Sequence, residues 1–261
     1  MEIIDFKQSN LNRVYKYNEE LKKTQSNFKQ LKSRLLKKQL LKIITFNKSK
    51  KRQIQENICY DKTELDKLEQ QIFRLTEKIT ALEKGVAGEK LVREHLKEQL
   101  SDSYYLINNF YFFNNSPCEI DHIIVGPAGF VIVETKHLGG KLFVHPCHYK
   151  WLRAPLNNPD AIKKPMKNPL KQLERNVAEF KSLLSEAEMG ELPVQGVLVF
   201  PRNSCLLSNR GCGEEFPVLY HDELIEYIDS LEKLDHLSDI SRLNCLVDNL
   251  IDLANQKNKR T

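Results

Sequence analysis

The sequence has no apolar run long enough to cross a membrane. A spanning helix needs about 20 consecutive apolar residues, and no such run occurs among the 261 residues. The acidic start, MEIIDF, also lacks the basic region of a signal peptide. We therefore expect a cytoplasmic protein. Hydrophobic residues still make up 41% of the chain, which is enough for a globular core.

Cysteines are few and follow no recognised pattern. None of the six forms a CxxC pair, and scattered thiols are typical of a reducing compartment. Residues 145–151, HPCHYKW, bring two histidines and a cysteine together, but this spacing matches no standard zinc site. We expect no zinc centre there.

Acidic residues are absent from residues 21–55, a segment that contains twelve lysines and arginines. The whole chain has a net charge of only +5, so the rest of it carries about −7. This polycation predicts contact with nucleic-acid phosphates. An anionic membrane surface and a plain solvated helix face are the alternatives, and we expect no membrane partner. The cations that we expect to bind nucleic acid are Lys37, Lys38, Lys48, Lys50, Lys51 and Arg52.

Hydrophobic spacing predicts a helical coiled-coil arm in residues 1–84. Apolar residues recur at intervals of three and four along one seam, and a weaker seven-residue repeat precedes it. A break within residues 45–53 would give a hairpin of two helices, whereas an unbroken rod would need a partner chain. Both arrangements imply association through the arm, and we expect a homodimer or a higher oligomer. The later seam is Ile54, Ile58, Leu65, Leu68, Ile72, Leu75, Ile79, Leu82 and Val86, and the earlier one is Val14, Tyr17, Leu21, Thr24, Phe28, Leu31 and Leu35.

Helix and strand patterns alternate in residues 85–231. Together they indicate an α/β fold, a mixed sheet flanked by helices. Residues 232–261 should form a C-terminal helix that packs on or extends this domain, and residues 152–169, rich in Pro, Asn and Lys, should form a long loop. The expected strands are 104–112, two within 119–137, 141–145, 194–200 and 217–220, and the expected helices are 85–100, 168–188 and two that begin near 222 and 238.

The segment EIDHIIVGPAGFVIVETKH, residues 119–137, has the pattern of a β-hairpin around a Gly-Pro-Ala-Gly turn. A turn centred between Pro127 and Ala128 pairs residues whose numbers sum to 255, which places Asp121 opposite Glu134. Opposed side chains have β-carbons ~4.5–5.5 Å apart. Two carboxylates are therefore forced together at the end of strands that are apolar on both faces.

These opposed carboxylates repel each other and are costly to desolvate. A shared proton, a salt bridge from Lys136 or a divalent metal ion would relieve the repulsion. Lys136 carries one charge, which is too few to neutralise Glu119, Asp121 and Glu134 together. Hard oxygen ligands without a nearby soft donor favour Mg²⁺, with Mn²⁺ as a substitute.

The hairpin resembles the PD-(D/E)XK nuclease signature, because Asp121 is followed by Glu134-Thr135-Lys136. One departure is that Ile120, not proline, precedes Asp121. Over about residues 85–230 the wider pattern resembles the nuclease-related domain (NERD) family. This resemblance implies a restriction-endonuclease-like core that hydrolyses phosphodiester bonds with a metal ion. The matching motifs are Gly88-Glu89, EIDHIIVGPAGFVIVETK, Trp151 and NPLKQ at 168–172.

The resemblance also implies roles for the matching residues. Asp121 and Glu134 would be metal ligands, with the main-chain carbonyl of Thr135 completing the shell. Lys136 would orient the attacking water and offset negative charge on the phosphate. The other two matching positions are Glu89, a further candidate ligand, and Gln172, a polar helix residue near the site.

We therefore expect a magnesium-dependent (endo)deoxyribonuclease of DNA processing or defence, whose basic arm aids DNA binding or dimerisation. RNA is the alternative substrate. The alternative function is a non-catalytic nucleic-acid-binding or scaffold protein with a nuclease-like domain. The intact acidic pair argues against this alternative, because an inactive site has no reason to retain buried repelling charges.

Overall fold

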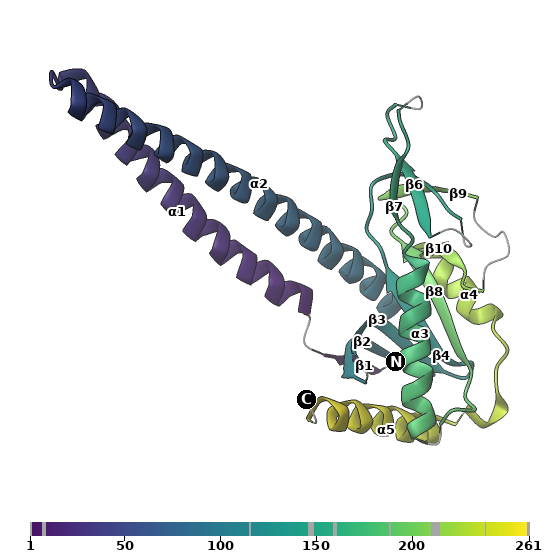
Figure 1. Ribbon diagram of the computed structural model, residues 1–261. Coiled ribbons are helices and arrows are strands. Elements are labelled where there is room, and N and C mark those ends of the chain that lie inside the picture. Colours follow the sequence, from purple (N-terminus) through teal and green to yellow (C-terminus); the bar gives the residue numbers. More distant parts are fainter. Residues whose placement is uncertain are drawn as a thin grey trace. The chain divides into compact units, whose positions relative to one another are not determined.

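The computed structural model describes residues 2–6, 9–114, 116–145, 149–158, 161–187, 189–209, 215–237 and 239–259. These residues form two compact units (Figure 1). The first is residues 9–83, and the second consists of the described parts of 1–8 and 84–261. The first unit is helical and the second has an α/β fold, as the sequence predicts.

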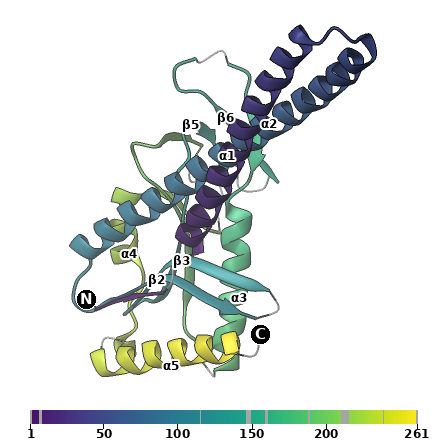
Figure 2. The ribbon, with the colours of Figure 1, turned by 90° about the vertical axis from the view of Figure 1, so that its left-hand side faces the viewer.

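The arm is a hairpin of two long helices, α1 (Ser9–Ile44) and α2 (Lys48–Gln99), joined by residues 45–47. Within residues 9–83 the helices run side by side in both views (Figures 1 and 2). The predicted break is confirmed, so the chain is not one unbroken rod. The helix expected from residue 85 is the end of α2 and not a separate helix. All predicted seam positions are buried or half-buried, and the most buried are Val14, Thr24, Leu35, Ile58, Leu75 and Ile79.

One buried charge interrupts the apolar seam of the arm. Asp61 on α2 is 1% exposed, and its carboxylate accepts a hydrogen bond from Arg34 (2.9 Å) and forms an ion pair with Lys38 (2.8 Å), both on α1. Lys38 holds the pKa of Asp61 below its usual range against the effect of burial, and Arg34 adds to the shift. Two of the twelve cations in residues 21–55 therefore bind an internal carboxylate.

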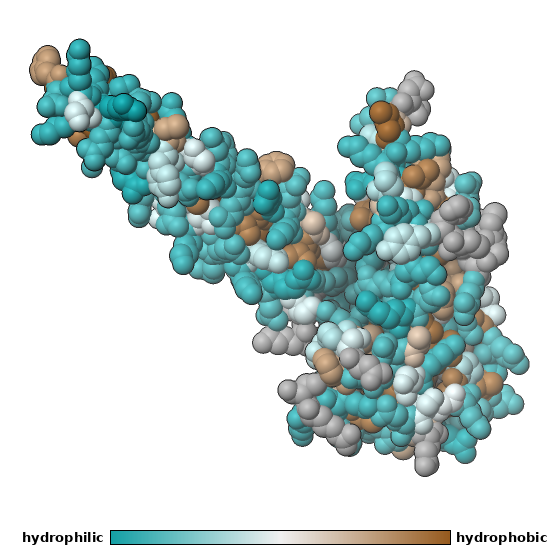
Figure 3. Space-filling view, viewed as in Figure 1, coloured by the Kyte–Doolittle hydropathy of each residue, from teal (hydrophilic) through white to brown (hydrophobic). Residues whose placement is uncertain are grey.

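Apolar side chains are exposed where α1 ends and α2 begins. Leu40, Ile43, Ile44 and Phe46 are between 65% and 97% exposed. Figure 3 shows apolar side chains at this end of the arm, while the rest of its visible surface is largely hydrophilic. The end of the arm therefore combines apolar side chains with the neighbouring cations of residues 37–52.

The α/β unit is built on a six-stranded mixed sheet in the order β1-β2-β3-β4-β8-β10. The pairs β2–β3 and β3–β4 are antiparallel, and the others are parallel. The edge strand β1 comes from the first residues of the chain, which the sequence patterns did not mark as a strand. The strands are β1 (Glu2–Asp5), β2 (Tyr105–Phe113), β3 (Pro117–Gly126), β4 (Gly129–Thr135), β8 (Val194–Phe200) and β10 (Val218–Tyr220).

Helices cover both faces of this sheet. The last turns of α2 and the short α4 (Leu224–Ser230) pack on one face. The other face carries α3 (Leu170–Glu186) and α5 (Ile240–Lys259), together with most of the aromatic core. Short 3₁₀ helices at His221–Glu223 and Asp235–Leu237 flank α4. Because both faces are covered, β4 is buried along its whole length.

A second, four-stranded sheet has the order β7-β6-β5-β9. Residues 152–169 are therefore not one long loop, because they hold the end of β6 and all of β7. The expectation of a loop was wrong because the burial of Trp151 holds β6 in the sheet. Its fully buried ring stacks on Phe200, and its Nε1 donates a hydrogen bond to the His145 carbonyl. Pro165 is tolerated because β7 is an edge strand. The strands are β5 (Gly140–Phe143), β6 (Lys150–Ala154), β7 (Lys164–Lys167) and β9 (Cys205–Ser208).

The sequence predicts that the chain has no membrane-spanning helix and no patterned cysteine pairs. Across the part of the chain that the structure describes, no helix is both long and apolar enough to cross a bilayer. The four described cysteines are free thiols, at positions 59, 118, 205 and 245. Cys147 and Cys212 lie outside the described residues, and so does His148 of the HPCHYKW motif.

Replacing Asp61 with alanine is expected to destabilise the arm by about 1–3 kcal/mol, because Arg34 and Lys38 lose the acceptor between them. The folded pKa of Asp61 is lowered. Its contribution is therefore present above the unfolded value of about 4 and is lost as the pH falls through the folded value. Thermal unfolding of the full chain, followed by circular dichroism at pH 7 and pH 3, measures both effects.

The matched control is Asp66→Ala, which removes an exposed carboxylate from the same helix. It should change stability by no more than about 0.5 kcal/mol. Equal unfolding curves for the two variants at pH 7 would show that Asp61 is not a structural bridge.

Candidate active site

The hairpin of β3 and β4 has the predicted register. Its paired residues run from Gly126–Gly129 to His122–Val133, so every pair sums to 255. The turn is Pro127-Ala128, as expected. Gly129 has φ +86°, and a β-carbon there would lie 2.5 Å from the Pro193 carbonyl oxygen, so only glycine fits this end of the turn.

The two strands separate just before the acidic residues. Beyond Val133, β4 continues along β8, where Glu134 pairs with Leu198, while β3 continues along β2. The β2 residue opposite Asp121 is Asn109, whose φ of 53° interrupts that ladder as well. Asp121 fills the opening, and its Oδ2 accepts a hydrogen bond of 2.7 Å from the Thr135 N–H.

Glu134 is held by side chains from two elements. It is 1% exposed, and its Oε1 accepts a hydrogen bond from the Nζ of Lys136, the residue directly after β4. Its Oε2 accepts a bond of 3.1 Å from Asn176 Nδ2 on α3. Lys136 is 26% exposed, so its ammonium group reaches both the buried carboxylate and solvent. The ion pair of Lys136 is with Glu134, although the register that sums to 255 would place Lys136 opposite Glu119.

Asn176 is a site residue that the sequence analysis missed. Besides Glu134, it donates to the Glu119 carbonyl (3.1 Å), and its Oδ1 accepts from the Cys118 thiol (3.7 Å). It therefore ties α3 to both of the separated strands. Its signal in the sequence is a lone polar residue on the apolar face of α3, next to Val177.

The charges of the site are unbalanced. Burial raises the pKa of Asp121, and the Glu134 carboxylate raises it further, while Lys136 and the Thr135 N–H oppose the shift. Burial also raises the pKa of Glu134, although Lys136 stabilises its charged form. Burial alone would lower the pKa of Lys136, but Glu134 and Asp121 outweigh it and raise the value. The pair therefore favours a proton or a further cation.

Glu89 lies within electrostatic reach of this group. It is 7% exposed on α2, on the same helical face as the fully buried Val92 and Leu96. Its carboxylate raises the pKa of both Glu134 and Lys136. The residue before it, Gly88, must lack a side chain, because a β-carbon there would lie 2.7 Å from Cβ of His137.

Gln172 lies one helical turn before Asn176 and lines a pocket of about 520 Å³ beside Lys136. The pocket is also lined by Tyr149, Lys167 and Arg175. The asparagine of NPLKQ, Asn168, has a structural role, because its Oδ1 accepts the N–H of Leu170 at the start of α3. The exposed ammonium of Lys136 therefore opens onto a cavity with a cationic wall.

His122, on the other side of β3 from Asp121, belongs to a buried polar chain. Its Nδ1 lies 2.7 Å from Asn108 Oδ1, and Asn108 Nδ2 donates to Asp5 of β1 (2.8 Å). Burial lowers the pKa of His122 to about 3, with Arg93 adding to the shift, so its ring is neutral. A neutral ring held in this way has a packing role.

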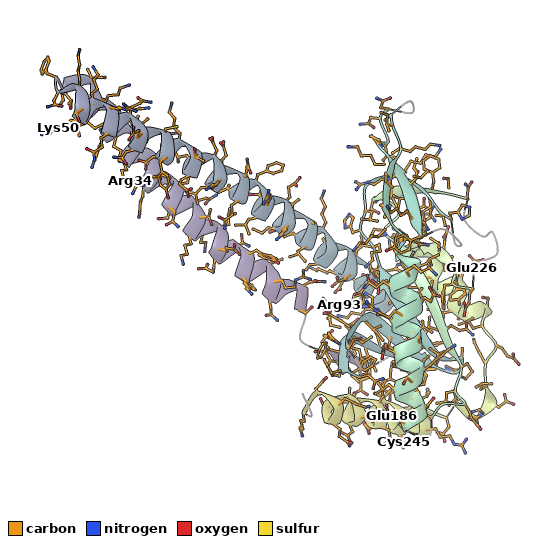
Figure 4. All side chains as sticks on the ribbon, viewed as in Figure 1. Arg34, Lys50, Arg93, Glu186, Glu226 and Cys245 are labelled. Carbon is orange, nitrogen blue, oxygen red and sulfur yellow. The ribbon has the colours of Figure 1, made fainter. Side chains whose placement is uncertain are left out.

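The predicted nucleic-acid-binding cations of the arm lie at the end of α1 and the start of α2, on either side of the connection at residues 45–47 (Figure 4, Lys50). Lys38 is bound to Asp61, and Arg52 pairs with Glu56 at 3.4 Å. No ion pair to another described residue neutralises the remaining four, Lys37, Lys48, Lys50 and Lys51. The first turn of α2 holds no acidic residue, so its cations face the positive end of the helix dipole.

The donor set fits a hard divalent cation only to a limited extent. Asp121 and Glu134 are two desolvated carboxylates with raised pKa values and one ammonium counter-charge. Oxygen donors of this kind suit Mg²⁺ or Mn²⁺. Among the described residues, however, no three His, Cys, Asp or Glu side chains form a ready metal cluster, so Glu89 does not complete one. Lys136 contacts the Oε1 atom that a metal ion would need.

A mixed sheet with helices on both faces, opened at an acidic pair and a lysine, is an α/β fold consistent with a nuclease. Residues 84–201, which contain the whole group, match the family model of the nuclease-related domain (NERD). The predicted resemblance is thereby confirmed for this segment. An uncharacterised protein of Bacillus anthracis is 27% identical over 149 residues, which are 56% of this chain and 66% of that protein. The match thus spans just under two thirds of that relative. No solved structure matches the chain significantly.

Asp121→Asn is expected to stabilise the metal-free protein by about 1–2 kcal/mol at pH 9, because the amide needs no counter-charge and still accepts the Thr135 N–H. The folded pKa of Asp121 is raised. The wild-type penalty therefore grows as the pH rises above the unfolded value of about 4 and is complete above the folded value. Urea unfolding of both proteins should show little difference at pH 4 and the largest difference at pH 9.

The control for this substitution is Asp235→Asn, which changes an exposed carboxylate of the same unit. If Asp121→Asn were no more stable than this control at pH 9, the carboxylate pair would not be strained.

Asn176→Ala is expected to lower the free energy of unfolding by about 1–3 kcal/mol, because Glu134 and the Glu119 carbonyl lose a buried donor. Gln172→Ala, one turn earlier in the pocket wall, is the comparison and should cost no more than about 0.5 kcal/mol. Chemical denaturation measures both. The reverse order of effects would mean that Gln172, and not Asn176, holds the site together.

Proposed function

We propose that this protein is a metal-dependent nuclease that hydrolyses phosphodiester bonds in DNA. The observation that carries the proposal is the group of Asp121, Glu134 and Lys136, buried at one end and open at the other to a cationic pocket. The match of residues 84–201 to the nuclease-related domain supports the class of activity. Expected settings are the cytoplasm and a task in DNA processing or defence.

Asp121, Glu134 and the main-chain carbonyl of Thr135 would hold Mg²⁺ or Mn²⁺. When bound, such an ion neutralises charge on the phosphate and makes water a stronger nucleophile. Lys136 is paired with Glu134 and also lines the pocket, where its ammonium group would contact a phosphate oxygen. Asn176 keeps Oε2 of Glu134 in place throughout.

The other chain groups act by position and charge. Gln172 and Arg175 line the pocket next to Lys136, where they can contact phosphate oxygens. Glu89 adds negative charge near Glu134, which increases the affinity of the site for a cation. The burial of the acidic pair excludes bulk water from this side, so charges there interact strongly.

The arm has a proposed role in DNA binding and in association. Lys37, Lys48, Lys50 and Lys51 carry charge without an ion pair to other described residues, which suits phosphate contact. Exposed apolar residues near them, above all Phe46, suit burial against a second copy of the arm. We therefore keep a homodimer or higher oligomer within the proposal.

A scaffold protein with an inactive nuclease-like domain is the second candidate function. One observation favours it, namely that the described residues contain no ready three-ligand metal cluster. The strain of the acidic pair weighs against it, because a scaffold gains nothing from two buried carboxylates with one counter-charge.

Cleavage of supercoiled plasmid and of single-stranded DNA, with Mg²⁺ and with chelator, tests the proposal. The wild-type protein should cleave at least one substrate only when the metal is present. Asp121→Ala and Lys136→Ala should each lower the rate by ~10²-fold or more, since each removes a group on which charge stabilisation depends.

Matched controls are Glu226→Ala and Lys233→Ala, which remove exposed charges elsewhere in the α/β unit. Both should retain the wild-type rate. Metal-independent cleavage, or equal rates for Asp121→Ala and Glu226→Ala, would contradict the proposed nuclease. A folded wild-type protein that binds DNA and cleaves neither substrate would favour the scaffold.

A further inference from the structure

A second cationic segment lies within the α/β unit itself. Residues 136–173 contain eight lysines and arginines and a single acidic residue, Asp160, which lies outside the described residues. Much of this charge is on the four-stranded sheet of β5, β6, β7 and β9, with further cations just before and after it. The cations are less dense here than in residues 21–55 of the arm, but this segment directly adjoins the candidate active site.

The strand register places several of these residues on one face of the small sheet. Lys150 pairs with Lys167, and Phe143 pairs with Leu152, while Lys141 occupies the same face two positions before Phe143. Lys163 Nζ lies 4.2 Å from the centre of the Phe143 ring and so joins them. We call these six residues, Lys141, Phe143, Lys150, Leu152, Lys163 and Lys167, the cationic face. The opposite face carries the buried Leu142 and Trp151 and packs on the core.

The charges on the cationic face have no anionic partner among the described residues of the protein. Like charges placed directly opposite, as in Lys150 and Lys167, destabilise an antiparallel pair. Neither residue forms an ion pair with a described carboxylate, nor do Lys141 and Lys163. The contrast with Arg34 and Lys38 of the arm, which bind Asp61, is clear. An external polyanion would relieve this repulsion.

The cationic face continues into the pocket of the candidate active site. Lys167 belongs to both, since it also lines the cavity of about 520 Å³ that contains Lys136 and Gln172. Tyr149, directly before β6, is 75% exposed and lines the same cavity. Figure 1 shows β6 and β7 near one end of α3, the helix whose first turn contains Gln172. A chain bound along the face would therefore lead to Lys136.

Exposed apolar and aromatic groups among the cations indicate which kind of polyanion fits. Leu152 is 40% exposed, Leu206 of the neighbouring strand is 56% exposed, and the Phe143 ring is half-buried between two lysines. The backbone of a duplex offers phosphates but keeps its bases stacked inside. A single strand offers both phosphates and the flat faces of its bases, which stack on aromatic side chains.

We infer that the cationic face binds single-stranded DNA and guides it to the pocket at Lys136. This inference rests on the proposed nuclease function, for which it names the substrate class and the binding surface. Lysines 141, 150, 163 and 167 contact successive phosphates, and Phe143 and Tyr149 stack on bases.

Fluorescence anisotropy of a labelled 20-nucleotide thymidine strand measures binding to the full chain. The measurement uses Asp121→Asn protein with chelator, so that cleavage does not interfere. The double variant Lys150→Gln with Lys167→Gln should bind about tenfold more weakly. It should also reduce the slope of log affinity against log salt by about 1.4, or ~0.7 for each phosphate of the single strand that is no longer neutralised.

Phe143→Leu separates stacking from charge, because it keeps an apolar side chain in the sheet. It should weaken single-strand binding about five- to tenfold and leave binding of a 20-base-pair duplex unchanged. The charge-matched control, Lys97→Gln with Lys233→Gln, removes two exposed cations outside the small sheet and should bind like the parent. Circular dichroism verifies that each variant is folded.

The outcomes distinguish this inference from the nuclease proposal. Unchanged binding by the Lys150 and Lys167 variant, or tighter binding of the duplex than of the single strand, would overturn the inference even if the wild-type protein cleaves DNA. Binding as expected by a protein that never cleaves would leave the inference intact and overturn the nuclease. Preference for a uridine RNA strand of the same length would move the substrate class from DNA to RNA and so overturn the inference as stated.

Discussion

The structure depends on one constraint, the packing of the buried Glu134 and the half-buried Asp121 against a single ammonium group where β3 and β4 separate. Glu134 is 1% exposed, and Asp121 lies in the gap with its Oδ2 on the Thr135 N–H. Lys136 and Asn176 each take one oxygen of Glu134. Neighbouring helices contribute to this group, because α3 provides the amide of Asn176 and α2 provides the carboxylate of Glu89. Such an arrangement is unfavourable in isolation, and the sheet with its two covered faces makes it possible.

The chain has two cationic regions although its net charge is only +5, and the cations of the two regions differ in their counter-charges. Some of the charge in the arm is internal, because Asp61 binds two of its cations and stabilises the hairpin. The lysines of the cationic face, in contrast, have no carboxylate partner among the described residues, and they lie next to the pocket that contains Lys136. Segments of similar composition can therefore differ in role, and only the positions of their counter-charges separate structural cations from those available to a ligand.

Much of the fold and of the acidic pair is predictable from sequence because both follow from period and turn geometry. Heptad spacing gave the hairpin arm, and the Gly-Pro-Ala-Gly turn fixed the register that brings Asp121 and Glu134 to the same end. The features that the sequence did not predict depend on contacts between residues far apart in the chain. The strand Glu2–Asp5 is too short to show a period, and β6 and β7 are specified by the burial of Trp151 within a Pro-rich segment. Asn176 was passed over for Gln172 because hydrogen bonds to main-chain and side-chain oxygens have no sequence pattern. The positive φ of Asn109, which coincides with the separation of the strands, has none either.

The central claim is that the acidic pair is kept for a divalent cation. Isothermal titration calorimetry of Mn²⁺ into the wild-type protein and into Asp121→Asn tests it most directly. The account predicts one site in the wild type, with binding at least about tenfold weaker in the variant, because one of two charged ligands is lost. No binding to the folded wild-type protein, or the same isotherm for both proteins, would contradict it.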